Sequence, residues 1–421
     1  VNTSGAQTYT GNATLGAATT LTGSTVTFGG TLGNSTSQTL AITGNAVFSG
    51  TVGAGTALTS VTVSGTTAIN GGSVNTSGAQ TYNDDMTLGA DTSLTTTSNG
   101  SVSIMGTVSG SQDLSITANG IGTVILGGDV TVGATAGALS ISAASLSLGA
   151  NVDISTVAVN GNINLTVDGL TLGGMNTIDA GTGTVAITPR TASYTVEFSP
   201  TDTALVTDVY YNSAFTGITA GAFRIGAATH TGTIYVATAA MTPSYSLTMQ
   251  NNGAIVVSNT YDASGVNGNL TLDSGAGGIA LNGGSINQGN GTFTAQDAVM
   301  LGANTTITAN GGIEFQSTID GAQSLTVSAG TGKVSFGGEV GGTTALTSVS
   351  VTSTNGGADA ITLRSVTTSG AQSYTGNVTL GADTTLTTTD SVVTFVGTVD
   401  PTTDSVEGLT LLAGSGNISV T

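Results

Sequence analysis

Val26-Thr27-Phe28-Gly29-Gly30-Thr31-Leu32 is followed, about 20 residues further on, by Ala46-Val47-Phe48-Ser49-Gly50-Thr51-Val52, and the two segments share one pattern. Apolar residues occupy alternate positions, and a Gly or Ser interrupts them before the last apolar residue. Alternation of this kind is typical of a strand with one buried face. The pattern returns, with some drift, at 102–108, 124–130, 313–319, 334–340 and 393–399.

The spacing of these segments indicates a solenoid in which each coil repeats the one before it. Helical repeats are disfavoured because the chain is rich in Thr, Val and Gly, and leucine-rich repeats are disfavoured because no dense Leu ladder is present. Gly and Asn between the strands supply the corners. The sequence therefore predicts an all-β, right-handed parallel β-helix with about 20 coils of roughly 20–22 residues, forming a rod about 95 Å long.

A longer phrase is superimposed on the coil pattern. Ser4-Gly5-Ala6-Gln7-Thr8-Tyr9 recurs at 77–82 and, with one Ser for Thr, at 369–374, and each copy is followed by Thr-Leu-Gly-Ala. Met300-Leu301-Gly302-Ala303 is a looser copy of this ending. The spacing of the copies is uneven, so we interpret the long repeat as imperfect. The chain begins and ends inside the repeat pattern, and we expect further coils of a longer chain to continue it.

One segment departs from the repeat pattern in its composition. Residues 186–245 contain three of the four prolines, five of the nine tyrosines and the single histidine. The domain organisation that we predict is a β-helix array over 1–185, an irregular or loop-bearing segment over 186–259 and a second array over 260–421. If any surface is specialised for interaction, we expect it in the middle segment, and the candidate residues are Tyr194, Tyr210, Tyr211, Arg224, His230, Tyr235 and Tyr245.

The composition excludes several classes of function. Only 6% of residues are charged and the net charge is −19, with four cations that are isolated from one another. Nucleic-acid binding needs clustered Lys and Arg, so it is not expected. The chain has no Cys and no run of 18 apolar residues, so we predict no disulfide, no thiolate metal site and no membrane insertion.

Catalytic chemistry finds little support in the residues. Carbohydrate-active enzymes on β-helices use clustered carboxylates, and the candidate pairs are Asp84 with Asp85, Asp202 with Asp208, and Asp400 with Asp404. None has a Lys or Arg nearby outside residues 190–224, and we interpret all three as solvated turn carboxylates. Binding of Ca²⁺ at such turns stays open. We expect His230 at the surface or in a loop, and we predict no cofactor, no metal and no enzymatic activity.

A short segment resembles a known family. Residues 218–226, Ile-Thr-Ala-Gly-Ala-Phe-Arg-Ile-Gly, followed by Thr-Ile-Tyr-Val at 233–236, are similar to the "ITAGTLRIG…ITV" phrase of filamentous-haemagglutinin-like exoproteins. Those proteins also carry Thr-, Gly- and Asn-rich arrays. The resemblance implies a β-helical passenger, exported by a two-partner or autotransporter route to the outer surface of a Gram-negative bacterium. Family members serve in adhesion, aggregation or contact-dependent competition, and no catalytic residue is implied for the shaft.

The residues and the resemblance together predict a rigid, non-catalytic stalk of a secreted or cell-surface adhesin, which spaces or displays binding surfaces. The alternative is a subunit of a self-assembling extracellular fibre or sheath, because low charge also weakens repulsion between neighbouring copies. A carbohydrate-active enzyme is a third, less favoured hypothesis. The partners that we expect are other copies of the chain or cell-surface glycans or proteins.

Overall fold

A computed structural model describes residues 1–133, 137–156, 158–171, 175–199, 208–212, 217–237, 245–265, 267–402 and 406–421, with the backbone alone for 171, 198, 199 and 208–212. The fold is all-β, and its parallel strands stack as a β-solenoid of about 17 turns. The predicted parallel β-helix is confirmed. The expected number of coils was slightly too high because the coils vary in length. Side-chain bonds between successive coils span 19 residues from Asn12 to Thr31 and 25 residues from Asp390 to Ser415.

The chain divides into two compact units. Unit 1 comprises Val1–Thr191 and Phe215–Phe223, and unit 2 comprises Ala192–Ala214 and Arg224–Thr421. Strand β25 (Ala222–Gly226) lies where the two ranges meet in the sequence. The three-part organisation that we predicted from the sequence stays a prediction.

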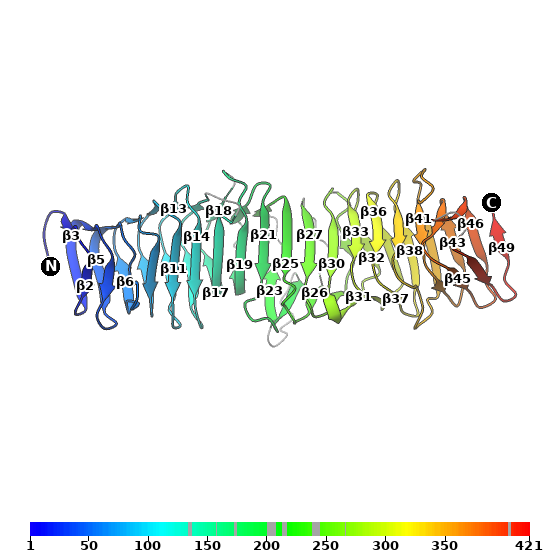
Figure 1. The fold of residues 1–421 in the computed structure, drawn as a ribbon, viewed down its shortest axis with the longest axis horizontal. Coiled ribbons are helices and arrows are strands. Elements are labelled where there is room, and N and C mark those ends of the chain that lie inside the picture. The colour runs from blue at the N-terminus through cyan, green and yellow to red at the C-terminus, as the bar shows by residue number, and fades with distance from the viewer. Residues whose placement is uncertain are drawn as a thin grey trace. The chain divides into compact units, whose positions relative to one another are not determined.

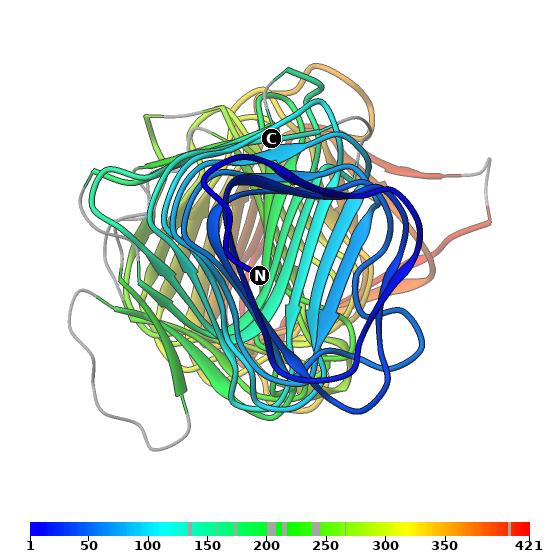
Figure 2. The same cartoon turned by 90° about the vertical axis from the view of Figure 1, so that its left-hand side faces the viewer.

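Each coil of unit 1 contributes strands to three faces, which we call 1A, 1B and 1C. In Figure 2 the blue and cyan strands stack one behind another around a common interior. Face 1A contains β2 (Ala13–Leu15), β4 (Leu32–Asn34), β8 (Ser73–Thr76), β11 (Thr92–Thr96), β14 (Leu114–Ala118), the first halves of β17 (Leu139–Leu148) and β19 (Ile163–Thr171), and β21 (Thr184–Thr188).

The other two faces of unit 1 share the long strands that bend between them. Face 1B contains the first halves of β3 (Thr19–Phe28) and β5 (Thr39–Phe48), β6 (Ser60–Val63), β9 (Gln80–Tyr82), β12 (Val102–Ile104), β15 (Thr123–Leu126) and the second halves of β17 and β19. Face 1C contains β1 (Gln7–Tyr9), the second halves of β3 and β5, β7 (Thr67–Ile69), β10 (Met86–Leu88), β13 (Val108–Ser109), β16 (Val130–Thr131), β18 (Asp153–Ser155), β20 (Thr177–Asp179) and β24 (Ile218–Thr219).

Unit 2 also has three faces, called 2A, 2B and 2C, and Figure 1 labels many of their strands, among them β23 and β49. Face 2A contains β27 (Ser246–Gln250), β30 (Leu270–Asp273), β33 (Thr292–Ala295), β36 (Gly312–Phe315), β39 (Val334–Phe336), β41 (Ile361–Leu363), β44 (Val378–Leu380) and β47 (Val399–Pro401).

The remaining strands of unit 2 form two further faces. Face 2B contains β22 (Thr195–Ser199), β23 (Asp208–Asn212), β26 (Ile234–Val236), β28 (Ile255–Val257), β31 (Ile279–Leu281), β34 (Val299–Leu301), β37 (Ile319–Asp320), β42 (Val366–Thr367), β45 (Thr384–Thr387) and β48 (Leu409–Leu412). Face 2C contains β29 (Tyr261–Asp262), β32 (Ser285–Asn287), β35 (Thr305–Thr308), β38 (Ser324–Ser328), β40 (Ser348–Thr352), β43 (Gln372–Thr375), β46 (Val393–Val396) and β49 (Ile418–Val420). The 3-10 turn Gly275–Gly277 is short, and no helix among the described residues is long and apolar enough to cross a membrane.

The core consists of columns of equivalent apolar residues, as the alternation predicts. On face 1A one column runs Val74, Leu94, Ile116, Ile141, Leu165 and Ile187, all of them buried. Aromatic rings also stack from coil to coil, with ring centroids 5.2 Å apart between Tyr9 and Phe28 and 5.9 Å apart between Phe28 and Phe48. Register is strongly specified because a slip of one residue would turn each column outward.

The repeated phrase forms a buried corner device. In the second copy, Gln80 donates from Nε2 to the backbone oxygens of Val74 (3.0 Å) and Thr95 (2.9 Å), while its Oε1 accepts from the Tyr82 hydroxyl at 3.0 Å. Gln7 and Gln372 make the corresponding bonds. Within unit 1, Gln7 lies on face 1C and Gln80 on face 1B. The phrase therefore specifies a corner and can be used at more than one side of the coil.

Candidate functional site

Most described corner carboxylates and amides serve the solenoid itself. Asn99, Asn160 and Asp390 have positive φ angles of 49°, 50° and 49°. Each side-chain oxygen accepts a backbone N–H of the next coil, from Ile121 at 3.1 Å, Thr182 at 2.9 Å and Ser415 at 2.7 Å. Asn and Asp favour such left-handed corners. The carboxylate of Asp390 therefore accepts the same inter-coil hydrogen bond that the side-chain amides of Asn99 and Asn160 accept.

Among the described members of the candidate catalytic pairs, Asp85 accepts from the next coil in the same way. Asp84 Oδ1 accepts the Asp85 backbone N–H at 2.8 Å, and Asp85 Oδ1 accepts from the backbone N–H (2.8 Å) and hydroxyl (2.9 Å) of Thr107. Asp400 is exposed on β47. Asp202, Asp404 and the side chain of Asp208 lie outside the described residues. Within the described part of the chain, no three His, Asp or Glu side chains gather as a metal site would require.

Acid should weaken the corner at Asp390, which gives a prediction for Asp390→Asn. The hydrogen bond from Ser415 holds the pKa of this exposed carboxyl below its ordinary value. A lowered folded-state pKa contributes stability above the unfolded pKa of about 3.9, and this stability is lost as the pH falls through the folded pKa. Thermal unfolding followed by circular dichroism at neutral pH and at about pH 2 should show a smaller acid-induced loss for the variant, because asparagine keeps the acceptor oxygen and cannot be protonated.

The matched control for this prediction is Glu314→Gln. Glu314 is an exposed carboxylate on β36 for which no hydrogen bond to a described residue is found. This variant should lose as much stability in acid as the unmodified chain. Equal acid sensitivity of the Asp390→Asn variant and the unmodified chain would contradict the assignment.

The residues that we proposed as an interaction surface all belong to unit 2, and they divide by exposure. Tyr194, Arg224 and Tyr235 are half-buried, so parts of their side chains reach solvent. His230 and Tyr245 are 1% and 5% exposed. We expected His230 at the surface or in a loop: it does lie in a loop, between β25 and β26, but its side chain is buried and not at the surface. Its ring points inward because Nε2 pairs with the backbone oxygen of Tyr194 at 2.7 Å, 36 residues away in the sequence. Tyr210 and Tyr211 lie on β23, and their side chains are outside the described residues.

Tyr235 begins an apolar row on the outer surface of face 2B. The strand register places Tyr235, Val256, Ala280 and Met300 side by side on successive coils, with Asp320 at the end. Equivalent rows on other faces are rich in Ser and Thr, for example Ser93, Ser115 and Ser140 on face 1A. Met300 is 50% exposed. This row therefore presents exposed apolar side chains of the kind that a partner surface covers.

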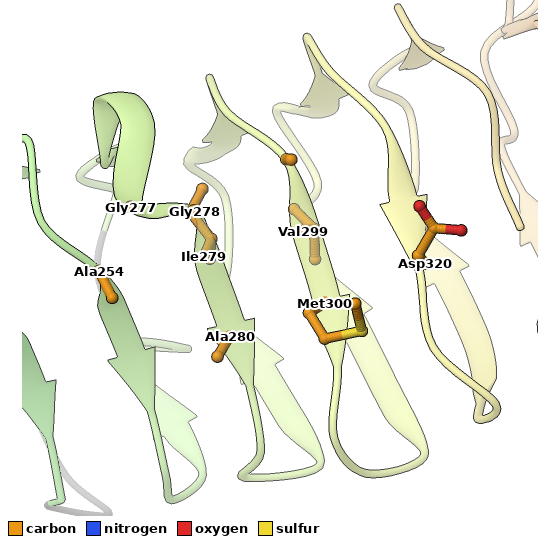
Figure 3. Close-up of a pocket in the computed structure, with 9 residues that line it drawn as sticks. Ala254, Gly277, Gly278, Ile279, Ala280, Val299, Met300 and Asp320 are labelled. Carbon is orange, nitrogen blue, oxygen red and sulfur yellow. The ribbon is translucent and has the colours of Figure 1, made fainter. Parts of the chain in front are cut away.

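A shallow hollow of about 250 Å³ lies along this row, and Figure 3 shows the side chains around it. Ala254, Gly277 and Gly278 lie toward one side of it, and Asp320 lies at the other. Asp320 is already engaged, because its Oδ1 accepts the backbone N–H groups of Thr343 and Thr344 at 2.8 Å. The remaining lining is apolar or backbone: Ala254, Gly277, Gly278, Ile279, Ala280, Ala298 and Val299. The hollow offers van der Waals contact and no group placed for catalysis.

Sequence reasoning did not find Met300 as a surface residue, although a signal was present. The ending Thr-Leu-Gly-Ala has Thr at positions 14, 87 and 379, and in the looser copy Met300 takes that place. Thr14 and Thr87 are exposed whereas Thr379 is buried, so the substitution puts a large apolar side chain where two of the three copies have an exposed hydroxyl.

A second, polar hollow of about 550 Å³ lies over β33, β36 and β39 on face 2A. Its lining combines Thr292, Thr294 and Ser335 with the charged Glu314 and Lys333. Lys333 also pairs with Asp359 at 2.6 Å, and both side chains are more than half exposed. Exposed ion pairs of this kind contribute little to stability.

The chain was compared with protein-family models, with curated proteins and with solved structures, and none of the three comparisons finds a match.

Proposed function

We propose that this chain is a non-catalytic structural shaft of a bacterial cell-surface protein, which spaces or displays binding surfaces. The observation that carries the proposal is the use of corner side chains as bonds between coils. Asn99, Asn160 and Asp390 each join one coil to the next. Bonds of this kind add to the backbone ladder at the corners, where a stack of coils would otherwise be held by turns alone.

The surface composition supports a stalk outside the cell. A stalk must stay soluble without adhering to nucleic acid or anionic membranes, and a weakly charged coat of Ser, Thr and Asn meets that need. The resemblance of residues 218–236 to filamentous-haemagglutinin-like exoproteins supports export to the surface of a Gram-negative bacterium. The polar corner groups of Asp85 and Asp390 are engaged in inter-coil bonds, which argues against a catalytic role for them.

The displayed contact surface that we propose is the apolar row on face 2B. Tyr235 and Met300 supply the largest side chains of the row, and hot spots of protein contacts are enriched in such tyrosines. The partners that fit are another protein or the apolar C–H face of a sugar ring in a cell-surface glycan.

The fibre alternative has its own supporting observation. On face 2C the outward column Ser285, Thr306, Thr326, Ser350, Ser373 and Thr394 contains no charged residue. Two such faces could approach without electrostatic repulsion. Lateral assembly through face 2C is therefore the second candidate function.

Sedimentation velocity of the purified 421-residue chain over a range of concentrations separates the two proposals. A shaft should sediment as a monomer with a frictional ratio well above that of a compact protein of 40.6 kDa, independent of concentration. Growth of larger species with concentration would favour the fibre, and Thr326→Lys with Ser350→Lys on face 2C should then abolish it. A compact monomer would contradict both proposals.

A further inference from the structure

One connector of unit 2 is longer than its neighbours at the same corner. The chain passes from face 2C to face 2A in three residues at 309–311, in five at 329–333 and in eight at 353–360. In repeat architectures, insertions in single repeats lie on one face, which is often the face that binds a partner. The long connector reaches the polar hollow over β33, β36 and β39, because its residue Asn355 lines that hollow. It therefore forms part of the wall of a candidate binding site.

Hydrogen bonds hold this connector against the preceding coil. The Ser353 hydroxyl donates to the backbone oxygen of Gly332 at 2.7 Å, and Asn355 Nδ2 donates to that of Thr331 at 2.8 Å. Asn355 Oδ1 accepts the backbone N–H of Gly357 at 2.9 Å, so the amide is engaged on both sides. A wall that is fixed before the ligand arrives loses little conformational entropy on binding.

The floor of the hollow is open because one outward position carries no side chain. The strand register pairs Thr292 with Gly312, and Lys333 takes the corresponding place on the next coil. Gly312 has a φ angle of 132°, in the region that favours glycine. A Cβ atom there would also lie 3.2 Å from the backbone oxygen of Lys333. The gap between Thr292 and Lys333 is therefore a property of the backbone.

Several polar side chains around this floor have hydrogen-bonding capacity to spare. Lys333 Nζ donates to Asp359 Oδ2 at 2.6 Å, but an ammonium group has three hydrogens, so two are left. Glu314 is an exposed carboxylate with two acceptor oxygens. No hydrogen bond to a described residue is found for its carboxylate or for four hydroxyl groups of the lining, those of Thr292, Thr294, Thr331 and Ser335. The hollow thus offers donors and acceptors close together.

Charge and polarity select the class of ligand. Asp359 balances the charge of Lys333, which leaves Glu314 as the one unbalanced charge of the lining. A phosphate or an acidic polymer would be repelled by that carboxylate, and a divalent cation needs more oxygen ligands with negative charge. A protein hot spot needs exposed aromatic or large apolar groups, whereas Phe293 and Ile313 in the lining are buried. An uncharged ligand with many hydroxyl groups fits these constraints.

We propose that the polar hollow on face 2A binds a neutral sugar unit. Two adjacent sugar hydroxyls donate to the carboxylate of Glu314, in the charge-assisted hydrogen bonds that are the stronger kind. Sugar oxygens accept from the ammonium group of Lys333 and from the hydroxyls of the lining. The volume of about 550 Å³ lies within the range of roughly 300–1,000 Å³ that is usual for small-molecule sites. This site lies on a different face from the apolar row, so the inference goes beyond the proposed stalk and does not depend on it.

Saturation-transfer difference NMR on the full 421-residue chain tests the proposal with neutral disaccharides. The probes are cellobiose, lactose, mannobiose and diacetylchitobiose, which differ in the arrangement of their hydroxyl groups. At least one should bind saturably, with a dissociation constant in the millimolar range, because the lining has no exposed aromatic ring on which a sugar could stack. Digalacturonic acid should bind more weakly than that disaccharide, since its carboxylates meet Glu314. Absence of binding by all four neutral probes, or tighter binding of the acidic one, would overturn the proposal.

Two exposed carboxylates in one outward row of face 2A provide matched variants. Glu314 lines the hollow, whereas Asp400 lies in the same row on β47, outside the lining. Glu314→Ala should weaken binding of the disaccharide by at least about tenfold, because it removes charge-assisted hydrogen bonds. Asp400→Ala should leave the dissociation constant unchanged, and both variants should keep the unfolding midpoint of the unmodified chain. If the two variants bind the disaccharide equally well, the sugar does not contact Glu314 and the assignment of the site is wrong.

Discussion

Replacing Gln80 by leucine should lower the free energy of unfolding of unit 1 by about 3 kcal/mol, since the substitution removes three hydrogen bonds and leaves a buried hydroxyl unpaired. Gln80 and Tyr82 are both fully buried. The change removes the donor to Val74 O and Thr95 O and the acceptor of the Tyr82 hydroxyl. Leucine keeps most of the volume, so the loss reports polar pairing and not a cavity. Urea unfolding followed by circular dichroism, with hydrogen exchange to localise the effect to unit 1, measures it.

A double-mutant cycle separates the orphaned hydroxyl from the lost glutamine bonds. Tyr82→Phe in the Gln80→Leu background removes the unpaired hydroxyl and should recover part of the stability, about 1–2 kcal/mol. Gln296→Leu is the control, because Gln296 is exposed at the end of β33, and it should change stability by less than about 0.5 kcal/mol. If Gln80→Leu behaves like this control, the corner device contributes nothing to stability.

Gly71→Ala should destabilise unit 1 by at least about 3 kcal/mol, because the corner between faces 1C and 1A has no room for a methyl group. A Cβ atom on Gly71 would lie 2.1 Å from the backbone carbon of Gly50, and one on Gly50 would lie 2.5 Å from that of Gly30. The obstructing atoms are backbone, so they cannot rotate away as a side chain would. The midpoint of thermal or urea unfolding, compared with that of the unmodified chain, measures the effect.

Gly16→Ala is the matched control for this steric argument. A Cβ atom there would meet nothing within 4 Å, and the φ angle of Gly16 is not positive. Alanine should therefore be neutral or stabilising by up to about 1 kcal/mol, since it restricts the unfolded chain. Equal unfolding midpoints for the Gly71→Ala and Gly16→Ala variants would show that the corner can open to accept a side chain.

The alternating pattern in the sequence does not predict the length and composition of each corner. Alternation shows which residues point inward, but a corner of any length leaves that alternation intact. The expected coil of roughly 20–22 residues therefore fitted Asn45 to Thr66, 21 residues apart, and failed at Asp129 to Asp153, 24 residues apart. The repeated phrase, which we interpreted from the sequence as an imperfect long repeat, places the same corner on different faces of unit 1, with Gln7 on face 1C and Gln80 on face 1B.

The candidate site was predicted only in part. The sequence directed attention to Tyr235 through the unusual composition of residues 186–245, and Tyr235 does lie at one end of the apolar row on face 2B. Met300 lies far from that segment in the sequence and joins the row only because four strands are stacked in register. His230 was expected at the surface or in a loop, and it lies in a loop. No signal in the sequence showed that its ring would be buried against a carbonyl oxygen 36 residues earlier.

By itself, the sequence determined the class of fold, the inward and outward faces of each strand and the weakly charged coat, because period-two alternation and composition are local properties that every coil repeats. Only the tertiary structure decided which coils meet, which side chains form a row and which polar atoms are buried together. Those relations depend on the register between strands, and the register is set by the packing of whole coils around a shared core.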